Sequence, residues 1–373
     1  MGEVTSAGLS ASKYWVGFNI VRGIGPMKFR ALLDHFGDLE TAWHADAHEL
    51  KEAGLDQRAL ESLLTARANI SLDREMEKVE HQGVRVLTWD DPAYPPRLLN
   101  IYNPPPVLYV KGEILNEDQW AVAVVGTRGA TVYGKEAARQ IAGDLARNRI
   151  TIVSGLAVGI DADAHAAAVE AGGRTIAVLA CGIDVDYPSH NLELRERIVG
   201  SGAVVTELAP GTPPTRDRFP QRNRILSGLA LGTVVIEAPV KSGALITARL
   251  AAEEGREVFA VPGNITSPVS RGCHALLREG AALVETAEDV VEGLGIMLEA
   301  VPEREPEQER RRKLEDLPGD QQQVLDALSH QPRNIDDVTG ECDLPASQVS
   351  AALMLLEVKG LVRRFPGNQF VRI

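Results

Sequence analysis

The feature that most constrains this sequence is a rhythm of buried strand, glycine loop and helix that repeats from residue 121 to residue 261. Repeated strand–helix units predict an α/β fold with a doubly wound, mostly parallel sheet. Ligands of such sheets bind at the carboxyl ends of the strands, which is where the glycine loops fall. The predicted strands are 121–125, 150–153, 175–179, 203–206, 233–237 and 257–261.

The first 82 residues form a different pattern, a small helical domain in which Tyr14, Trp15 and Phe18 make an apolar helix face. The turn Gly23-Ile24-Gly25 resembles a helix-hairpin-helix (SAM-like) motif, whose backbone N–H groups can face a DNA phosphate. A glycine-rich turn between two helices explains the same residues equally well. A charged helix over 67–82, a strand over 84–89 and an extended proline-rich connection over 90–106 are expected to follow.

The sheet core is predicted over 83–296, a charged linker over 297–313 and a separate domain over 314–373. Three helical segments followed by a hairpin at Pro366-Gly367-Asn368 resemble a winged helix, a module that binds DNA or another protein. The helix before the hairpin carries only Lys359 as a base, so protein interaction is favoured over duplex reading.

The basic cluster at residues 216–224 is unusual for this chain, which is acidic, with 39 Lys+Arg against 52 Asp+Glu and a net charge of −13. That balance argues against duplex binding by the whole surface. Residues 216–224 nevertheless hold four arginines and one acid. Guanidinium groups suit phosphate oxygens, and the ring of Phe219 suits a base, so this segment predicts an anion site. Paired arginines at a helix start are the alternative.

A glycine next to a Ser or Thr recurs in the predicted loops around this basic cluster, at residues 126–127, 154–155 and 242–243. Glycine lets the backbone approach a phosphate, and a hydroxyl adds a hydrogen bond. Tight strand-to-helix turns would explain any one of these loops alone. The residues predicted to contact a polyanion are Gly126, Thr127, Arg128, Ser154, Gly155, Arg216, Phe219, Arg222, Asn223, Arg224, Lys241, Ser242 and Gly243.

Several other functions find no support in the sequence. It has no Walker or dinucleotide fingerprint, and no cofactor, metal or catalytic residue is predicted. Asp161 is placed to cap a helix, and Asp163 and His165 point to different faces of it. Three distant cysteines indicate a reducing, cytoplasmic setting, and no membrane-length apolar run occurs.

Taken together, five segments resemble the DNA-processing protein A family (DprA or Smf). They are 125–128, 154–162 with His165, 219–224, 242–248 and 261–264. The resemblance implies an extended Rossmann-like core that binds single-stranded DNA without being an enzyme. It also implies a homodimer that loads the RecA recombinase onto the strand during natural transformation.

The resemblance also implies roles for single residues. Arg128 would contact DNA, Arg216 would meet a phosphate, and Phe219, Arg222 and Asn223 would line the same pocket. Ser189 stands where many family members carry a Lys. A helix over 272–283 would supply the dimer and RecA contacts, through His274, Leu277 and Leu283.

Two other functions compete with this one. A phosphoribohydrolase-like enzyme on a related core would carry paired glycines and a trailing Glu at the last strand–helix turn, and residues 242–247 lack both. A sensor of small nucleotides is the third possibility. A titration of poly-dT against AMP would separate the three.

Overall fold

The computed structural model of the chain describes residues 6–296, 317–328, 333–342, 344–359, 361–365 and 368–372. Two compact units divide the chain, one comprising residues up to 302 and the other the residues from 303 on. The linker predicted over 297–313 lies outside the described residues. Within those residues, no helix is long and apolar enough to cross a membrane.

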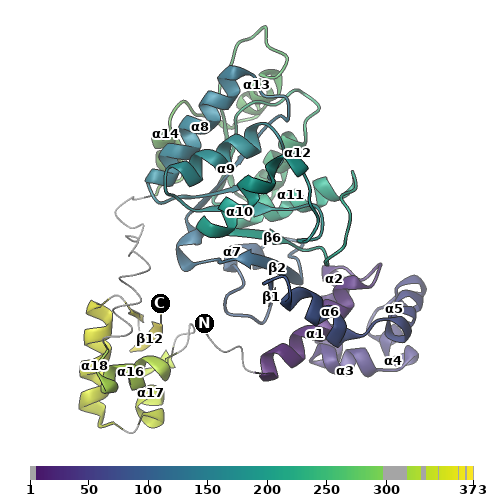
Figure 1. The fold of residues 1–373 in the computed structure, drawn as a ribbon, viewed down its shortest axis with the longest axis vertical. Helices are drawn as coiled ribbons and strands as arrows, with labels where there is room; N and C mark the ends of the chain where they lie inside the picture. The colour runs from purple at the N-terminus through teal and green to yellow at the C-terminus, as the bar shows by residue number, and fades with distance from the viewer. Residues whose placement is uncertain are drawn as a thin grey trace. The chain divides into compact units, whose positions relative to one another are not determined.

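The first unit is built on a twisted sheet, which its described residues form from nine strands in the order β1-β2-β6-β5-β4-β3-β7-β8-β9 (Figure 1). The run from β6 to β9 is parallel, whereas β2 is antiparallel to both β1 and β6. This confirms the mostly parallel sheet. The strands are β1 (Arg85–Thr88), β2 (Val107–Gly112), β3 (Ala121–Val125), β4 (Thr151–Ser154), β5 (Thr175–Val178), β6 (Ala203–Thr206), β7 (Gly232–Val235), β8 (Glu257–Ala260) and β9 (Ala282–Leu283).

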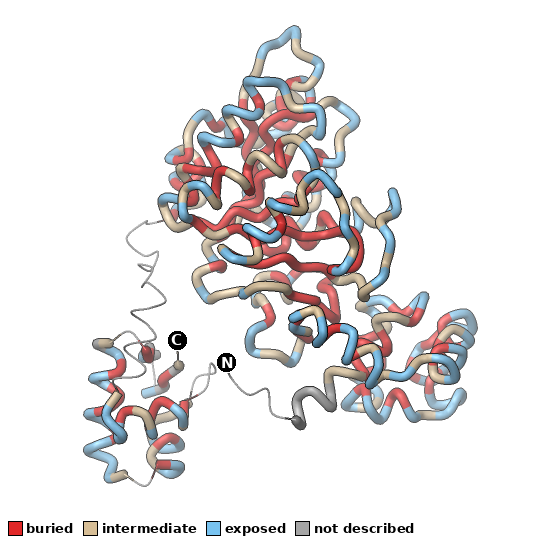
Figure 2. Tube along the Cα trace, viewed as in Figure 1, coloured by how far each residue is buried: buried red, intermediate tan, exposed pale blue. Residues whose placement is uncertain are grey.

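Helices cover both faces of this sheet, because successive strand residues alternate between two cores. Val122 and Val124 pack with one set of helices, whereas Val125 packs with the other. Figure 2 shows the buried strands between the helical layers. One face carries α8 (Val132–Arg147), α9 (Ile160–Glu170), α10 (Leu192–Ser201) and α14 (Ala287–Gly293); the other carries α7 (Pro96–Leu99), α11 (Arg218–Leu229), α12 (Gly243–Glu253) and α13 (Arg271–Arg278).

The N-terminal helices pack directly on this sheet. Phe18 of α1 and Tyr109 of β2 are fully buried members of one hydrophobic core, so residues up to 82 and the sheet form a single compact unit. Gly23, at φ +92°, turns the chain from α1 into α2. These helices are α1 (Ser6–Ile20), α2 (Pro26–Phe36), α3 (Leu39–His44), α4 (Ala47–Glu52), α5 (Gln57–Asn69) and α6 (Leu72–Glu80).

Two expected elements differ in detail from the structure. The helix predicted over 67–82 begins only at Leu72, because Ser71 caps the new helix by accepting from the Arg74 N–H at 3.4 Å. The connection predicted as extended over 90–106 contains α7, which begins at a proline, a residue tolerated in the first helical turn. Short 3₁₀ turns occur at η1 (Asn116–Gln119) and η2 (Ser189–Asn191).

The helix predicted over 272–283 ends at Arg278. The chain then turns at Gly280, at φ +106°, which favours glycine, and Leu283 lies in the edge strand β9. The expected helical surface is therefore a helix followed by a strand.

The described residues of the second unit form three helices and a three-stranded antiparallel sheet, the arrangement expected for a winged helix. Val349, Leu353 and Leu356 are buried in its core, as their spacing predicts. Pro366 and Gly367 of the predicted hairpin turn lie outside the described residues. Its elements are α16 (Gly319–Asp326), β10 (Arg333–Asn334), α17 (Ile335–Glu341), α18 (Ala346–Val358), β11 (Val362–Phe365) and β12 (Gln369–Arg372).

Candidate nucleic-acid interface

A pocket of about 310 Å³ opens at the carboxyl edge of the sheet, where the glycine loops meet the arginine-rich segment. The β3–α8 loop supplies Arg128, and the segment from β6 into α11 supplies most of the other residues. The start of α12 closes one side through Gly243. The pocket is lined by Arg128, Arg216, Phe219, Pro220, Asn223 and Gly243, so the structure brings together residues that the sequence singled out from three separate loops.

The centre of this pocket is a contact between a cation and a ring. The guanidinium carbon of Arg128 lies 4.9 Å from the centroid of the Phe219 ring, within the range of a cation–π interaction. Tyr187 packs edge-on against the same ring, with centroids 5.8 Å apart and an interplanar angle of 60°. Phe219 is thus held between two side chains and supports the guanidinium group at the protein surface.

Arg128 and Arg216 are both exposed at the pocket. Among the residues that the structure describes, neither has a carboxylate within 4 Å. An unpaired guanidinium group keeps its donors for an external anion, and a phosphate can accept two of them side by side. The pocket is therefore a local positive site in a chain of net charge −13.

The loop that carries Arg128 is anchored by Glu237, a buried residue that follows β7. The Thr127 N–H donates to the Glu237 carbonyl oxygen at 2.7 Å. The Thr131 N–H and hydroxyl donate to the two carboxylate oxygens at 2.9 and 2.6 Å. Gly134 leaves room for that carboxylate, because a Cβ there would lie 2.2 Å from Oε2. One residue thus fixes both ends of the segment 127–131.

Arg222, expected to line the pocket, lies inside the protein and is not among the lining residues. It is 5% exposed, and its Nη1 donates to the carbonyls of Val178 and, at 2.8 Å, of Gly155. Burial lowers the pKa of Arg222 to about 10, and the nearby Asp161 carboxylate opposes that shift. The group stays charged at neutral pH and joins the ends of β4 and β5 instead of facing solvent.

Arg224 and Ser154 also have internal partners. Arg224 forms a half-buried ion pair with Glu207, so its guanidinium group is already neutralised. The fully buried Ser154 hydroxyl donates to the Val124 carbonyl at 2.6 Å. Neither side chain is among the residues that line the pocket, so both are engaged in contacts within the protein.

Asp161, Asp163 and His165 lie near one another in sequence but have separate environments. Gly159, not Asp161, is the N-cap residue of α9, and the Asp161 carboxylate accepts from the Gly155 N–H at 3.2 Å. Asp163 pairs with Arg139 at 3.2 Å. The buried His165 Nδ1 lies 2.6 Å from the Thr175 hydroxyl. Within the described residues, no three His, Cys, Asp or Glu side chains gather as metal ligands would.

The other predicted residues shape the loops. Asn223 donates to the Gly243 carbonyl at 3.2 Å while lining the pocket, and Ser242 caps α12 by accepting from the Ala244 N–H at 3.3 Å. Lys241 is exposed. The Thr127 hydroxyl accepts from the Gly129 N–H at 3.2 Å, and Gly126 packs against Ile160, which leaves no room for a Cβ.

His274, Leu277 and Leu283 lie in the segment from α13 to β9. The His274 Nε2 is 3.1 Å from the Gly263 carbonyl, and Leu277 is half-buried. Leu283, on the edge strand β9, is 52% exposed. The α13–β9 segment therefore presents two apolar side chains, Leu277 and Leu283, that are at least partly exposed.

Two contributors were missed from the sequence. Tyr187 was visible only as part of a Tyr-Pro step, and nothing in that step indicates a contact with Phe219. Glu237 is the last residue of the predicted strand 233–237, and its role in holding 127–131 requires knowledge of the neighbouring strand. Both depend on contacts between segments far apart in the sequence.

Comparison with known proteins identifies two family models and several relatives that match this chain. A family model described as DNA recombination-mediator protein A matches residues 85–295, and a second, the DprA winged helix domain, matches residues 308–368. Protein Smf of Synechocystis sp. is 35% identical over 402 aligned residues, which cover 97% of this chain and 99% of that protein.

Two solved structures resemble the chain. DNA processing protein A from Streptococcus pneumoniae has a TM-score of 0.67 at 36% identity and covers 75% of this chain and 97% of its own. DNA processing protein A from Helicobacter pylori, described for its single-stranded DNA binding mode, has a TM-score of 0.50 at 28% identity. That match covers 56% of this chain and 95% of its own.

Proposed function

Because the chain belongs to the DNA recombination-mediator protein A family, we propose that it binds single-stranded DNA in the pocket of Arg128, Arg216 and Phe219. The observation that carries this proposal is the unpaired Arg128 guanidinium group held over the Phe219 ring at 4.9 Å. Basic groups that follow the backbone, beside aromatic rings that meet bases, are how proteins hold single strands without reading sequence.

A single strand fits this site better than a duplex does. The pocket has two exposed arginines rather than a broad basic face, and the chain as a whole is acidic. A duplex would bring more phosphates toward that acidic surface, and its stacked bases would not reach Phe219. The Helicobacter pylori relative, described for single-stranded DNA binding, supports the same choice of ligand.

The remaining steps of the proposal rest on family membership. The bound strand would be protected and passed to the RecA recombinase in the cytoplasm during DNA uptake, by a homodimer formed through the α13–β9 segment. The protein would act by binding and not by catalysis. His274, Leu277 and Leu283 are the residues proposed for the dimer and RecA contacts.

Titrations of the full chain with labelled poly-dT and with a duplex of the same length test the binding proposal. Preference for poly-dT by at least about tenfold, ~1.4 kcal/mol, is expected. Equal affinity for both, or no binding of either, would overturn it. RecA assembly on strands already coated with a single-strand-binding protein tests the loading step: the chain should accelerate assembly, and an unchanged rate would remove that step alone.

A further inference from the structure

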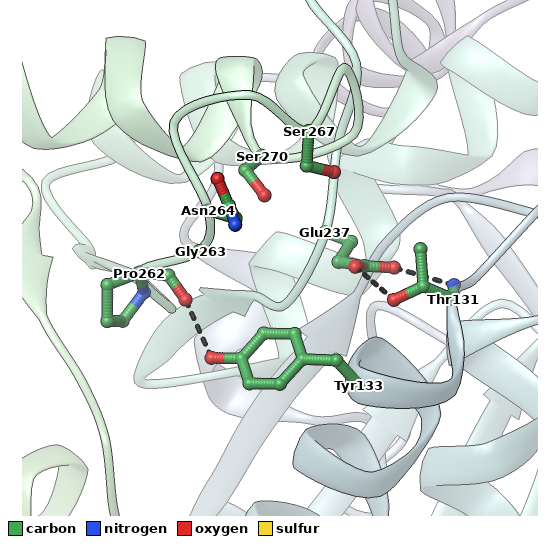
Figure 3. A pocket seen from close by; sticks show the side chains of 8 residues that line it. All are labelled: Thr131, Tyr133, Glu237, Pro262, Gly263, Asn264, Ser267 and Ser270. Atoms are coloured by element: carbon green, nitrogen blue, oxygen red, sulfur yellow. Dashed lines mark hydrogen bonds between the residues drawn. The ribbon is translucent and has the colours of Figure 1, made fainter.

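A second cavity, of about 510 Å³, opens at the same carboxyl edge of the sheet (Figure 3). It sits where the strand order reverses, since β3 continues to β4 on one side and is bordered by β7 on the other. Ligands of doubly wound sheets bind at such switch points. The cavity is lined by Thr131, Tyr133, Glu237, Pro262, Gly263, Asn264, Ser267 and Ser270.

The lining excludes an anionic ligand. Among the described residues that form it, none is a Lys, Arg or His, and the one charged group is the Glu237 carboxylate. A phosphate would meet that carboxylate without a compensating cation, which is unfavourable in a partly enclosed site. This distinguishes the cavity from the arginine pocket and points to a neutral ligand.

Hydrogen-bonding groups face the interior of the cavity. The Asn264 Oδ1 accepts from the Thr266 N–H and hydroxyl at 2.9 and 2.8 Å, which fixes the amide. Its Nδ2 and the Ser270 hydroxyl point into the cavity in Figure 3. An amide donor beside a hydroxyl, which donates or accepts, can pair with the polar edge of a heterocycle.

Tyr133 forms one wall of the cavity. Its phenol donates to the Pro262 carbonyl at 2.7 Å, a bond that fixes the ring, and 51% of the residue remains exposed. Burial and then the Glu237 carboxylate raise the pKa of Tyr133, so the phenol stays protonated and keeps this bond at neutral pH. An exposed, fixed aromatic face is a stacking surface for a planar ring.

We propose that this cavity binds a nucleoside, with the base stacked on Tyr133 and its polar edge paired with Asn264 and Ser270. The volume is within the range of small-molecule sites. The cavity also shares two loops with the arginine pocket, because Arg128 and Thr131 belong to one loop while Glu237 and Gly243 flank another. The nucleoside is therefore either free in solution or part of a bound strand.

Calorimetric titration of the full chain with each of the four deoxynucleosides tests this inference. One-to-one binding of at least one of them, at equal affinity in low and high salt, is expected because the ligand is neutral. Tyr133→Leu should weaken it by about tenfold or more, the size of a lost stacking contact. Tyr133→Phe keeps the ring and should retain binding, and a melting curve of each variant checks the fold.

Binding of none of the nucleosides, or equal binding by Tyr133→Leu, would overturn the inference. So would binding that is lost in Arg128→Ala, because the ligand would then occupy the other pocket. Competition identifies the source: displacement of the nucleoside by poly-dT assigns the cavity to a base of the strand, and simultaneous binding assigns it to a free nucleoside. If the protein binds poly-dT but none of the nucleosides, the nucleoside site is ruled out and the proposed single-stranded DNA binding still stands.

Discussion

The guanidinium group of Arg222 lies directly against Gly155: its Nη1 donates to the Gly155 carbonyl at 2.8 Å, and a Cβ on Gly155 would stand 2.3 Å from its Nη2. The glycine is required by a buried arginine, whereas the sequence suggested that both residues approach a phosphate. Arg222 is thus internal, whereas Arg216 of the same segment is exposed and lines the pocket.

Arg222→Ala should therefore act mainly on stability. It leaves the carbonyls of Gly155 and Val178 buried and unpaired, and we expect the free energy of unfolding to fall by about 2–4 kcal/mol. Arg128→Ala, the matched surface variant, should change it by less than about 0.5 kcal/mol. Urea unfolding measures both. A stable Arg222→Ala protein that has lost poly-dT binding would return Arg222 to the interface.

His165 should make stability depend on pH. Burial lowers the pKa of His165 in the folded protein to about 3, from an ordinary value of 6.5. Between these values the unfolded chain binds the proton that the folded protein excludes, so the stability from neutral His165 is lost as pH falls. The slope from this residue is about 1.4 kcal/mol per pH unit below pH 6.5.

The control variant for the pH dependence of His165 is His165→Asn, because the Asn side chain does not titrate. Unfolding free energies of both proteins, measured at several pH values between neutral and mildly acidic, should converge as pH falls, because only the parent loses this contribution. Carboxylates elsewhere affect both proteins alike. Parallel curves would mean that His165 is protonated at little cost in the folded state.

The α13–β9 segment should carry the dimer contact. Leu277→Arg and Leu283→Arg together should place charge in an apolar interface and give monomers at concentrations where the parent is a dimer. Leu283 is 52% exposed, so Leu283→Arg alone should leave the fold intact. Light scattering decides this, and a double variant that remains dimeric would place the interface elsewhere.

The winged-helix unit should be dispensable for binding the strand. Residues from 303 on form a separate compact unit, and no Lys or Arg occurs within α18. Its exposed Met354 and Leu355 fit a protein partner better than they fit a phosphate backbone. A chain ending at Ala300 should keep its poly-dT affinity within about tenfold, ~1.4 kcal/mol. A larger loss in a fluorescence titration would show that the tail contributes directly.

The fold was largely predictable because its signals are local. Alternation and apolar runs located the parallel strands, and glycine loops after the strands located the edge that carries both cavities. The α7 turn was missed because a proline-rich stretch resembles an extended connection. The core shared across the division expected at residue 82 was not predictable, since the contact of Phe18 of α1 and Tyr109 of the sheet with one core joins segments far apart in the sequence.

The site was predictable in position but not in the roles of its side chains. Arg216, Arg222 and Arg224 are neighbours in sequence, yet one is exposed, one is buried and one is paired with Glu207. Which side of α11 faces the sheet depends on packing against β4 and β5. Sequence spacing along one helix does not contain that information, and for the same reason neither Tyr187 nor the anchoring role of Glu237 was identified.

The central claim is that Arg128 meets a phosphate while Phe219 supports it and meets a base. Poly-dT titrations at several salt concentrations test this directly, with Arg128→Ala, Phe219→Ala and the parent compared in parallel and each melted as a control. Arg128→Ala should weaken binding and reduce the log–log salt slope by about 0.7, the value for one lost single-strand phosphate contact. Phe219→Ala should weaken binding by about 1–3 kcal/mol and leave that slope nearly unchanged. An Arg128→Ala protein that is folded and keeps the parent slope would contradict the account.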